Sequence, residues 1–260
     1  MPGAYDALSA KLIEAAGFPA VYIGSYATAA SRFGLPDVGL LSLDELAAQA
    51  KTVCDAVNIP VLADAEGGFH APANMWRTVT AFEDAGVCAI HIEDHAFGKH
   101  ANVPQRLLTL EQTTARLKAA LDARRDKDLL IVGRTDAHWA LGDTEEAIRR
   151  ANAYTDCGCD LVFLTGFTPQ LLKQHRARIK GRVMLVDTPG EPVSAEREAG
   201  ASVVLYYGFS LLAAYASVKQ ALEEFKRTHN ADHVRAATPD LERFLGYADF
   251  AARAKRYKEV

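Results

Sequence analysis

Four segments of the sequence repeat one pattern, and this repeat constrains the fold more than any other feature. Each segment leaves a helix, passes a glycine and continues into an apolar strand; the segments are residues 15–25, 84–94, 156–166 and 198–208. A glycine at this point suits the left-handed residue that ends a helix, and the four are Gly17, Gly86, Gly158 and Gly200. The repeat therefore predicts that helices and strands alternate along the chain.

Three further apolar runs fit between these segments, at residues 59–66, 128–137 and 181–188. The runs are almost continuously apolar, which is typical of parallel strands buried on both faces. Amphipathic stretches at residues 110–125 and 144–157 indicate helices that connect them. A doubly wound sheet and a closed barrel both fit this alternation. The length and the regular recurrence favour an α/β fold of the (β/α)₈ TIM-barrel type.

The two ends of the chain depart from the regular pattern. Seven strands are evident, and residues 2–17 have the character of a first loop and helix, so we expect the first strand to be truncated or to lie upstream of Met1. Residues 1–260 are expected to form one domain, with residues 226–260 as a more charged, helical C-terminal extension. Its apolar residues are expected to pack on the barrel or on a partner subunit; they are Leu241, Phe244, Leu245, Tyr247 and Phe250.

Composition excludes several classes of partner. The net charge is -4 without a basic cluster, which gives no reason to expect nucleic acid. The apolar runs are too short and interrupted for a membrane span, and the N-terminus lacks the features of a signal peptide. The four cysteines lack zinc-site spacing. We expect reduced cysteines and a cytoplasmic protein.

Acidic side chains stand where predicted strands end. Asp64 and Glu66 follow one apolar run and Glu93 ends the next, while Arg134 lies near the end of a third. The carboxyl ends of barrel strands converge on the active site, and clustered carboxylates repel one another unless a cation or protons intervene. These three acids are therefore predicted to hold a hard divalent cation such as Mg²⁺. Arg134 is predicted to bind a substrate carboxylate, or to form an ion pair with one of the glutamates.

A zinc site is the alternative, because His91, Glu93 and His95 alternate along one strand face. His91 lies deeper in the strand and is expected to be an interior residue. Magnesium is therefore the preferred ion.

Several motifs together resemble the isocitrate lyase/phosphoenolpyruvate mutase superfamily. They are "PGAYDALSAKLIEAAGF", "GLPD", "VLADAEGGF", "IEDHAFGK" and "GRTDA", and the resemblance runs from about residue 2 to residue 225. It implies a (β/α)₈ barrel that binds Mg²⁺, with Mn²⁺ as an alternative, and a 2-oxo or enolate-forming acid. It also implies a homotetramer in which C-terminal helices are swapped between barrels.

The resemblance gives roles to particular residues on the metal side. Asp64 matches a direct Mg²⁺ ligand, and Glu66 stands where the family motif usually has a second, shorter aspartate. Glu93 matches a glutamate that holds the metal through water. These three residues are the implied metal site.

On the substrate side, the resemblance implies that Arg134 contacts the substrate and that Asp37 lies near the metal and the substrate. Ser25, with the backbone of Tyr26 and Ala27, matches the segment that holds the substrate carboxylate.

The loop after the Glu93 strand departs from the lyase pattern K-[KR]-C-G-H. Lys99 matches, but Ala101 stands at the cysteine position and is followed by Asn102 and Val103. Elsewhere, Thr165 replaces a glutamate of the lyases and His70 replaces a motif glycine. These departures argue against the standard methylisocitrate lyase and phosphoryl-transfer mechanisms.

We therefore expect a Mg²⁺-dependent lyase that cleaves a C–C bond of a small 2-oxo or 2-hydroxy dicarboxylate through an enolate. Retro-aldol cleavage and decarboxylation both fit, and retro-aldol cleavage needs proton transfer. Arg134, Lys99 and His100 are the catalytic candidates, with His95 as a further proton donor. A phosphonopyruvate-type P–C hydrolase or mutase and an inactive acid-binding barrel are the alternatives. The loops at 166–170 and 187–194 are expected to set specificity.

Overall fold

A parallel eight-stranded sheet forms the centre of the computed structural model, which describes residues 1–258. The strands follow the order β1-β2-β3-β4-β7-β8-β9-β10, and each pairs in parallel with its neighbour. Their bounds are Gly3–Ala4, Val21–Ile23, Val61–Asp64, Ala89–Glu93, Leu130–Thr135, Leu161–Leu164, Val183–Val186 and Val203–Leu205. A separate antiparallel pair, β5 (His95–Phe97) and β6 (Arg106–Leu107), follows β4. The predicted (β/α)₈ barrel is confirmed.

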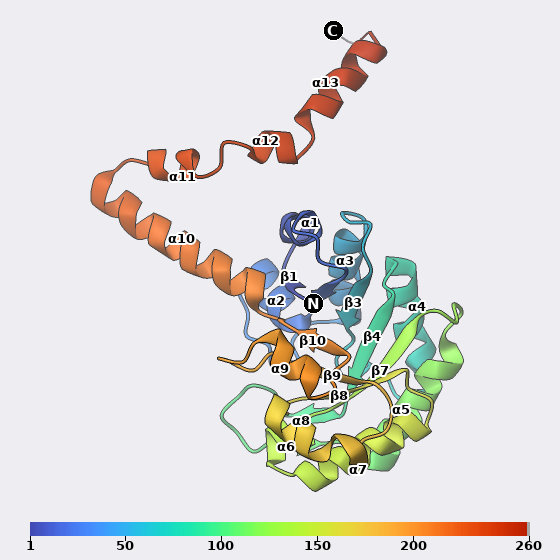
Figure 1. Ribbon diagram of the computed structural model, residues 1–260. Helices are drawn as coiled ribbons and strands as arrows, with labels where there is room; N and C mark the ends of the chain where they lie inside the picture. The colour runs from blue at the N-terminus through green and yellow to red at the C-terminus, as the bar shows by residue number, and fades with distance from the viewer. Residues whose placement is uncertain (259–260) are drawn as a thin grey trace. The chain divides into compact units, whose positions relative to one another are not determined.

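Helices connect the strands and cover their outer side (Figure 1). In chain order they are α1 (Ala7–Ala15), α2 (Ser25–Thr28), α3 (Leu43–Cys54), α4 (Met75–Ala85), α5 (Leu110–Ala123), α6 (Ala137–Leu141), α7 (Thr144–Asp156), α8 (Pro169–His175) and α9 (Val193–Glu198). A π-helical turn (Ala29–Phe33) and two 3₁₀ turns (Pro72–Asn74 and Arg176–Arg178) complete the connections. No helix in the described part of the chain is both long enough and apolar enough to cross a bilayer.

The repeat that the sequence shows has the predicted local structure. The glycine that ends each of the four helices has a positive φ, between 83° and 105°. Helix starts carry the expected caps; Ser42 and Glu45 form a reciprocal capping box on α3, as do Thr109 and Gln112 on α5. Each predicted strand lies inside its expected range, so the pattern located all seven of them.

The first strand is present and truncated, as one of the two expectations had it, and the alternative that it lies upstream of Met1 is wrong. It consists only of Gly3 and Ala4, which pair with β2 on one side. On the other side the Gly3 N–H donates to the Tyr206 carbonyl at 2.9 Å and Pro2 bridges to Tyr206, which brings β1 against the end of β10. A Cβ on Gly3 would lie 2.3 Å from the Tyr207 carbonyl oxygen, so this seam needs glycine. Two small residues carry no apolar pattern, which explains why the strand was not evident.

The inside of the barrel is filled by a separate cluster of buried side chains. Alternate residues of each strand point inward, and these are Tyr22, Leu62, Ala89, Val132, Leu161, Phe163, Met184 and Leu205. The opposite faces of the strands pack with the helices in a larger apolar cluster. The inward parity decides which polar residues reach the mouth of the barrel.

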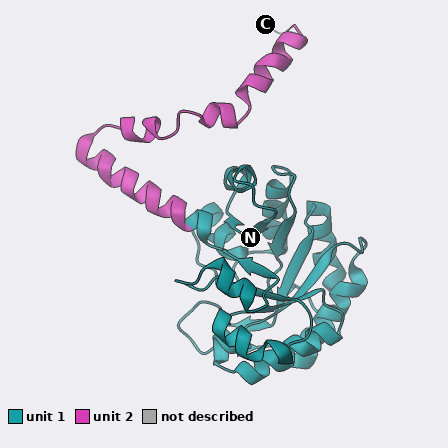
Figure 2. Cartoon of the chain, viewed as in Figure 1, with its two compact units in different colours: residues 1–211 teal, residues 212–260 magenta. Residues whose placement is uncertain are grey.

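The chain divides into two compact units, residues 1–211 and residues 212–260 (Figure 2). The first contains the barrel. The second contains most of α10 (Phe209–Thr228), then α11 (Asp232–Ala236), α12 (Leu241–Phe244) and α13 (Tyr247–Arg256). The helical character expected of residues 226–260 is observed in α11, α12 and α13, the last of which ends at Arg256, and whether residues 1–260 form a single domain stays a prediction. Within the second unit Tyr247 is 61% and Phe250 64% exposed.

Candidate active site

The inward-facing positions of the barrel change from apolar to charged at the carboxyl ends of its strands. On β3, Leu62 belongs to the interior cluster and Asp64 comes two residues later. On β7, Val132 is likewise interior and Arg134 follows at the same parity. Glu93 ends β4, which lies between these two strands. Three neighbouring strands therefore deliver two acids and one arginine to the same end of the barrel.

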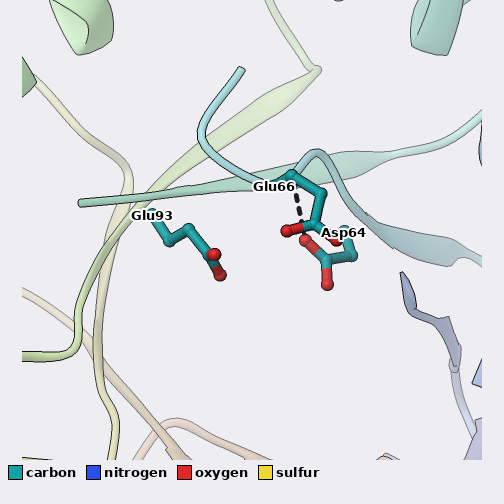
Figure 3. A group of neighbouring side chains, drawn as sticks. All are labelled: Asp64, Glu66 and Glu93. Atoms are coloured by element: carbon teal, nitrogen blue, oxygen red, sulfur yellow. Dashed lines mark hydrogen bonds between the residues drawn. The ribbon is translucent and has the colours of Figure 1, made fainter. Parts of the chain in front are cut away.

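Asp64, Glu66 and Glu93 form a buried carboxylate cluster. One oxygen of each lies within 4.8 Å of the others (Figure 3). The apolar run at residues 59–66 predicted a strand that includes Glu66. Strand β3 instead ends at Asp64, so Glu66 lies beyond it. It lies in a turn with a left-handed φ of 48°, and its N–H donates to Asp64 Oδ1 at 2.7 Å. The turn, rather than strand alternation, brings the two acids together.

Two buried cations balance this cluster. Lys99 Nζ donates to Glu66 Oε2 at 2.8 Å and lies 3.2 Å from Glu93 Oε1 and 3.7 Å from Asp37 Oδ2. Arg134 Nη1 lies 3.0 Å from Glu93 Oε2. The ion pair expected between Arg134 and a glutamate is therefore present, with Glu93.

The pKa values of the three carboxyl groups are shifted in different directions. Burial raises the pKa of Glu66 and Glu93, and the charge of Asp64 adds to this effect at Glu66. At Asp64 burial acts in the same direction, but His91, Lys99 and Arg134 hold its pKa below the usual value. Burial opposes charge on Lys99 as well, yet the surrounding carboxylates raise its pKa. Asp64 is consequently the most acidic member of the cluster.

The cluster fits a hard divalent cation. Glu66 Oε1 is buried without a hydrogen-bond partner, and Glu93 Oε2 has its ion-pair contact with Arg134 but no hydrogen bond. Buried acceptors without donors are costly, and convergent carboxylate oxygens are the ligands that Mg²⁺ prefers. A cation bound by Asp64, Glu66 and Glu93 would satisfy these atoms.

The alternative zinc set is not brought together. His91 is fully buried, as expected, and its Nε2 lies 3.1 Å from the Tyr22 hydroxyl. Burial lowers its pKa to about 4, so the ring is neutral at pH 7. His95 contacts Asp136 through Nδ1 at 3.0 Å and the Phe97 carbonyl through Nε2 at 3.0 Å. Both nitrogens of His95 are thus engaged away from the acids.

Arg134 is held by a second buried carboxylate. Asp136 accepts from Arg134 Nε at 2.8 Å and from Nη2 at 3.1 Å. The Asp136 N–H donates in turn to Asp94 Oδ1 at 2.9 Å, and Asp94 Oδ2 accepts from Arg150 and Tyr154 on α7. This network fixes the guanidinium before any ligand binds.

The residues expected to bind substrate are only partly gathered. Ser25 Oγ donates to Asp64 Oδ2 at 2.9 Å, which orients that carboxylate. His100 Nε2 lies 3.4 Å from Asp37 Oδ2, and His100 has a left-handed φ of 57°. Tyr26 packs edge-on against His100, with 6.3 Å between ring centroids. Ala27 is buried in α2 and is not among the described residues that line the adjoining cavity.

A cavity of about 310 Å³ adjoins the acids and Arg134. Its lining includes Asp64, Arg134 and His100 together with parts of both expected specificity loops, residues 166–168 and 187–189. Aromatic residues that sequence reasoning did not identify complete the walls: Tyr22, Trp139, Phe163 and Tyr207. Inward strand parity was the available signal for Tyr22 and Phe163, whereas no pattern marked Trp139.

Comparisons with known proteins show which family and which folds this chain resembles. The sequence model described as phosphoenolpyruvate phosphomutase matches residues 1–226. The 2,3-dimethylmalate lyase of Eubacterium barkeri is 33% identical over 262 residues, 98% of this chain and 89% of its own. The crystal structure of phosphoenolpyruvate phosphomutase from Streptomyces platensis subsp. rosaceus has a TM-score of 0.90 at 28% identity and covers 98% of this chain and 93% of that one. A phosphonopyruvate hydrolase solved with oxalate and Mg²⁺ has a TM-score of 0.88 at 27% identity, with the same coverage of each chain.

Proposed function

The chain belongs to the phosphoenolpyruvate phosphomutase family of the isocitrate lyase/phosphoenolpyruvate mutase superfamily, and on that premise we propose that it is a Mg²⁺-dependent lyase. It would cleave a C–C bond of a small 2-oxo or 2-hydroxy dicarboxylate through an enolate. The observation that carries this proposal is the buried cluster of Asp64, Glu66 and Glu93 at the mouth of the barrel, beside a cavity that Arg134 also lines.

In this proposal Asp64, Glu66 and Glu93 hold Mg²⁺, for which Mn²⁺ can substitute. When bound, the divalent cation supplies positive charge that stabilises the oxygen of a developing enolate. Ser25 orients Asp64 through its hydroxyl. Lys99 pairs with Glu66 and Glu93 and is a further catalytic candidate in this proposal.

Arg134 would bind a substrate carboxylate. Its guanidinium is already fixed by two hydrogen bonds to Asp136, so little side-chain entropy is lost on binding. Burial opposes its charge, but Asp136 and Glu93 raise its pKa, which keeps it cationic. A planar cation of this kind matches a carboxylate in geometry and charge.

His100 is the proposed proton donor or acceptor. It lines the cavity, contacts Asp37 and is 37% exposed at its side chain. Imidazole exchanges protons near neutral pH, and retro-aldol cleavage requires such a group while decarboxylation does not. Loss of turnover in a His100→Gln variant would therefore favour retro-aldol cleavage over decarboxylation.

The test is ¹H and ³¹P NMR of purified protein with Mg²⁺ against oxaloacetate, 2-methylisocitrate, 2,3-dimethylmalate and phosphonopyruvate, with EDTA controls. Metal-dependent conversion of a carbon acid is expected, and its product distinguishes decarboxylation from retro-aldol cleavage. Conversion of phosphonopyruvate alone would support a P–C hydrolase or mutase, which the phosphonopyruvate hydrolase structure favours as the second candidate. Thermal shifts with these acids but no conversion of any would indicate an acid-binding barrel without activity.

The Asp64→Ala variant tests the metal assignment. It is expected to abolish metal-dependent turnover while circular dichroism shows an intact fold. Asp55→Ala is the matched control, since Asp55 directly follows α3 and its exposed side chain pairs with Lys51. Full turnover by Asp64→Ala in Mg²⁺ would refute the proposed metal site.

We further propose a homo-oligomer, the tetramer that the family resemblance implies. Helix α10 carries an exposed apolar face within the second unit, made of Leu212, Tyr215, Val218, Leu222 and Phe225. Contiguous exposed apolar faces mark interaction surfaces. Light scattering during gel filtration measures the mass directly, and a monomer would refute this proposal. The cytoplasmic location stays a prediction.

A further inference from the structure

The charged side chains at the barrel mouth are distributed unevenly around it. Strands β2, β3, β4 and β7 provide or precede Ser25, Asp64, Glu93 and Arg134. Strands β8, β9 and β10 complete the ring on the other side. We name their contribution the β8–β10 wall: Phe163, Thr165, Gly166, Phe167, Thr168, Val186, Asp187, Thr188, Pro189, Leu205 and Tyr207.

The β8–β10 wall contains no basic side chain. Among the described residues that line the cavity, the basic ones are Arg134 and His100, from β7 and from the loop after β5. The one carboxyl group of the wall is that of Asp187, which directly follows β9 and adds negative charge. The amino group of Met1 donates to the Val204 carbonyl at 2.7 Å and is not part of the lining.

The remainder of the wall is uncharged, with apolar side chains beside the hydroxyls of Thr165, Thr168, Thr188 and Tyr207. Phe163 and Phe167 are each 2% exposed, and Leu205 is 1% exposed. The Thr165 hydroxyl is buried and has no hydrogen-bond partner, so it is available to a neutral oxygen of a ligand.

We propose that the β8–β10 wall selects a substrate whose C3 substituent is an uncharged alkyl group and excludes one that carries a further carboxylate. This inference rests on the proposed function, since it assumes that the acid core binds beside Asp64 and Arg134. A third carboxylate directed at this wall would be removed from water without a cationic partner and would face Asp187. Burial of an unpaired charge is strongly unfavourable, whereas an alkyl group gains from the same surface.

A matched pair of ligands tests this selection. Isocitrate is malate with a carboxymethyl group at C3, and 3-isobutylmalate has the same branched shape without the charge. Each is titrated in Mg²⁺ by competition calorimetry against oxalate, which reports on the acid core alone. The wild type is expected to bind 3-isobutylmalate at least about tenfold more tightly than isocitrate. Discrimination of this size is typical of sites that leave a buried polar group unpaired.

Variants of the β8–β10 wall test whether its lack of positive charge causes this selectivity. Thr188 is half-buried, so Thr188→Lys adds a cation to the wall and Thr188→Met adds similar length without charge. Thr188→Lys is expected to improve isocitrate binding about tenfold relative to Thr188→Met, and Asp187→Asn to improve it severalfold. Equal or tighter binding of isocitrate by the wild type would overturn the proposal, and so would equal effects of the two Thr188 variants. Failure of oxalate itself to bind with Mg²⁺ would instead refute the proposed function, and this inference with it.

Discussion

Asp136→Asn should be among the most destabilising conservative changes in the barrel. The Asp136 carboxylate is fully buried and accepts from Arg134 Nε and Nη2, at 2.8 and 3.1 Å, and lies 3.0 Å from His95 Nδ1. Removing one partner of a buried ion pair costs about 3–5 kcal/mol, because the other charge is left uncompensated. Glu93 remains 3.0 Å from Arg134 Nη1, so we expect the lower end, about 3 kcal/mol.

Urea unfolding followed by circular dichroism measures this loss of unfolding free energy. Asp55→Asn is the matched control, because Asp55 also accepts from a cation at 2.8 Å but its side chain is 62% exposed. An exposed pair of this kind contributes less than about 1 kcal/mol. A loss below about 1 kcal/mol for Asp136→Asn, or one equal to that of Asp55→Asn, would refute the argument from burial.

The same experiment has a pH dependence with a defined sign. Burial acts to raise the pKa of Asp136, but Arg134 and His95 hold it below the usual value of 3.8. The unfolded chain therefore takes up this proton at a higher pH than the folded protein does. The stabilisation is fully present above about pH 4 and decreases as the pH falls below it. The difference between wild type and Asp136→Asn should accordingly be constant from pH 7 to pH 5 and shrink below pH 4.

Two further variants and one labelling experiment test other parts of the structure. Lys99→Met removes a cation that would compete with Mg²⁺ for Glu66, so calorimetry should show Mg²⁺ binding about tenfold tighter, and weaker binding would refute this competition. Burial, followed by the neighbouring Cys88, raises the pKa of Cys54 from 9.0 to about 11. Its thiolate fraction at pH 8 is then about 100-fold reduced, and mass spectrometry should show iodoacetamide labelling of Cys54 that is slow in the native protein and fast in urea. Tyr154→Phe removes a 2.8 Å hydrogen bond to Oδ2 of the buried Asp94 carboxylate and should cost about 1.5–3 kcal/mol in urea unfolding, whereas a loss below about 0.5 kcal/mol would show that Arg150 is sufficient to satisfy this oxygen.

Much of the fold follows from the sequence because its signals are local. A helix that ends in glycine before an apolar run is a short-range pattern, and it located seven strands correctly. The first strand was not recognised because Gly3 and Ala4 are held by backbone hydrogen bonds to Tyr22, Ile23 and Tyr206 rather than by an apolar pattern of their own. Pairing between residues so distant in the chain leaves no local trace.

The candidate site divides in the same way. Asp64, Glu66 and Glu93 were identifiable because each stands at the end of an apolar run, where barrel sites form. The engagement of His95 by Asp136 was not predictable, since it depends on how β5 and the residue after β7 lie relative to each other. Nor could the sequence show that Lys99 lies among the acids, because only the folded loop after β5 brings it there.

The separation of the barrel mouth into two sides has a consequence for how such an enzyme can change. Side chains that hold the acid core come from β2, β3, β4 and β7, while those facing the substituent come from β8, β9 and β10. Substitutions on the second side can accumulate without altering the reaction on the first. A library randomised at Thr165, Val186, Asp187 and Thr188 should therefore yield new substrate preferences from a conserved reaction centre, which makes this wall the natural target for directed evolution.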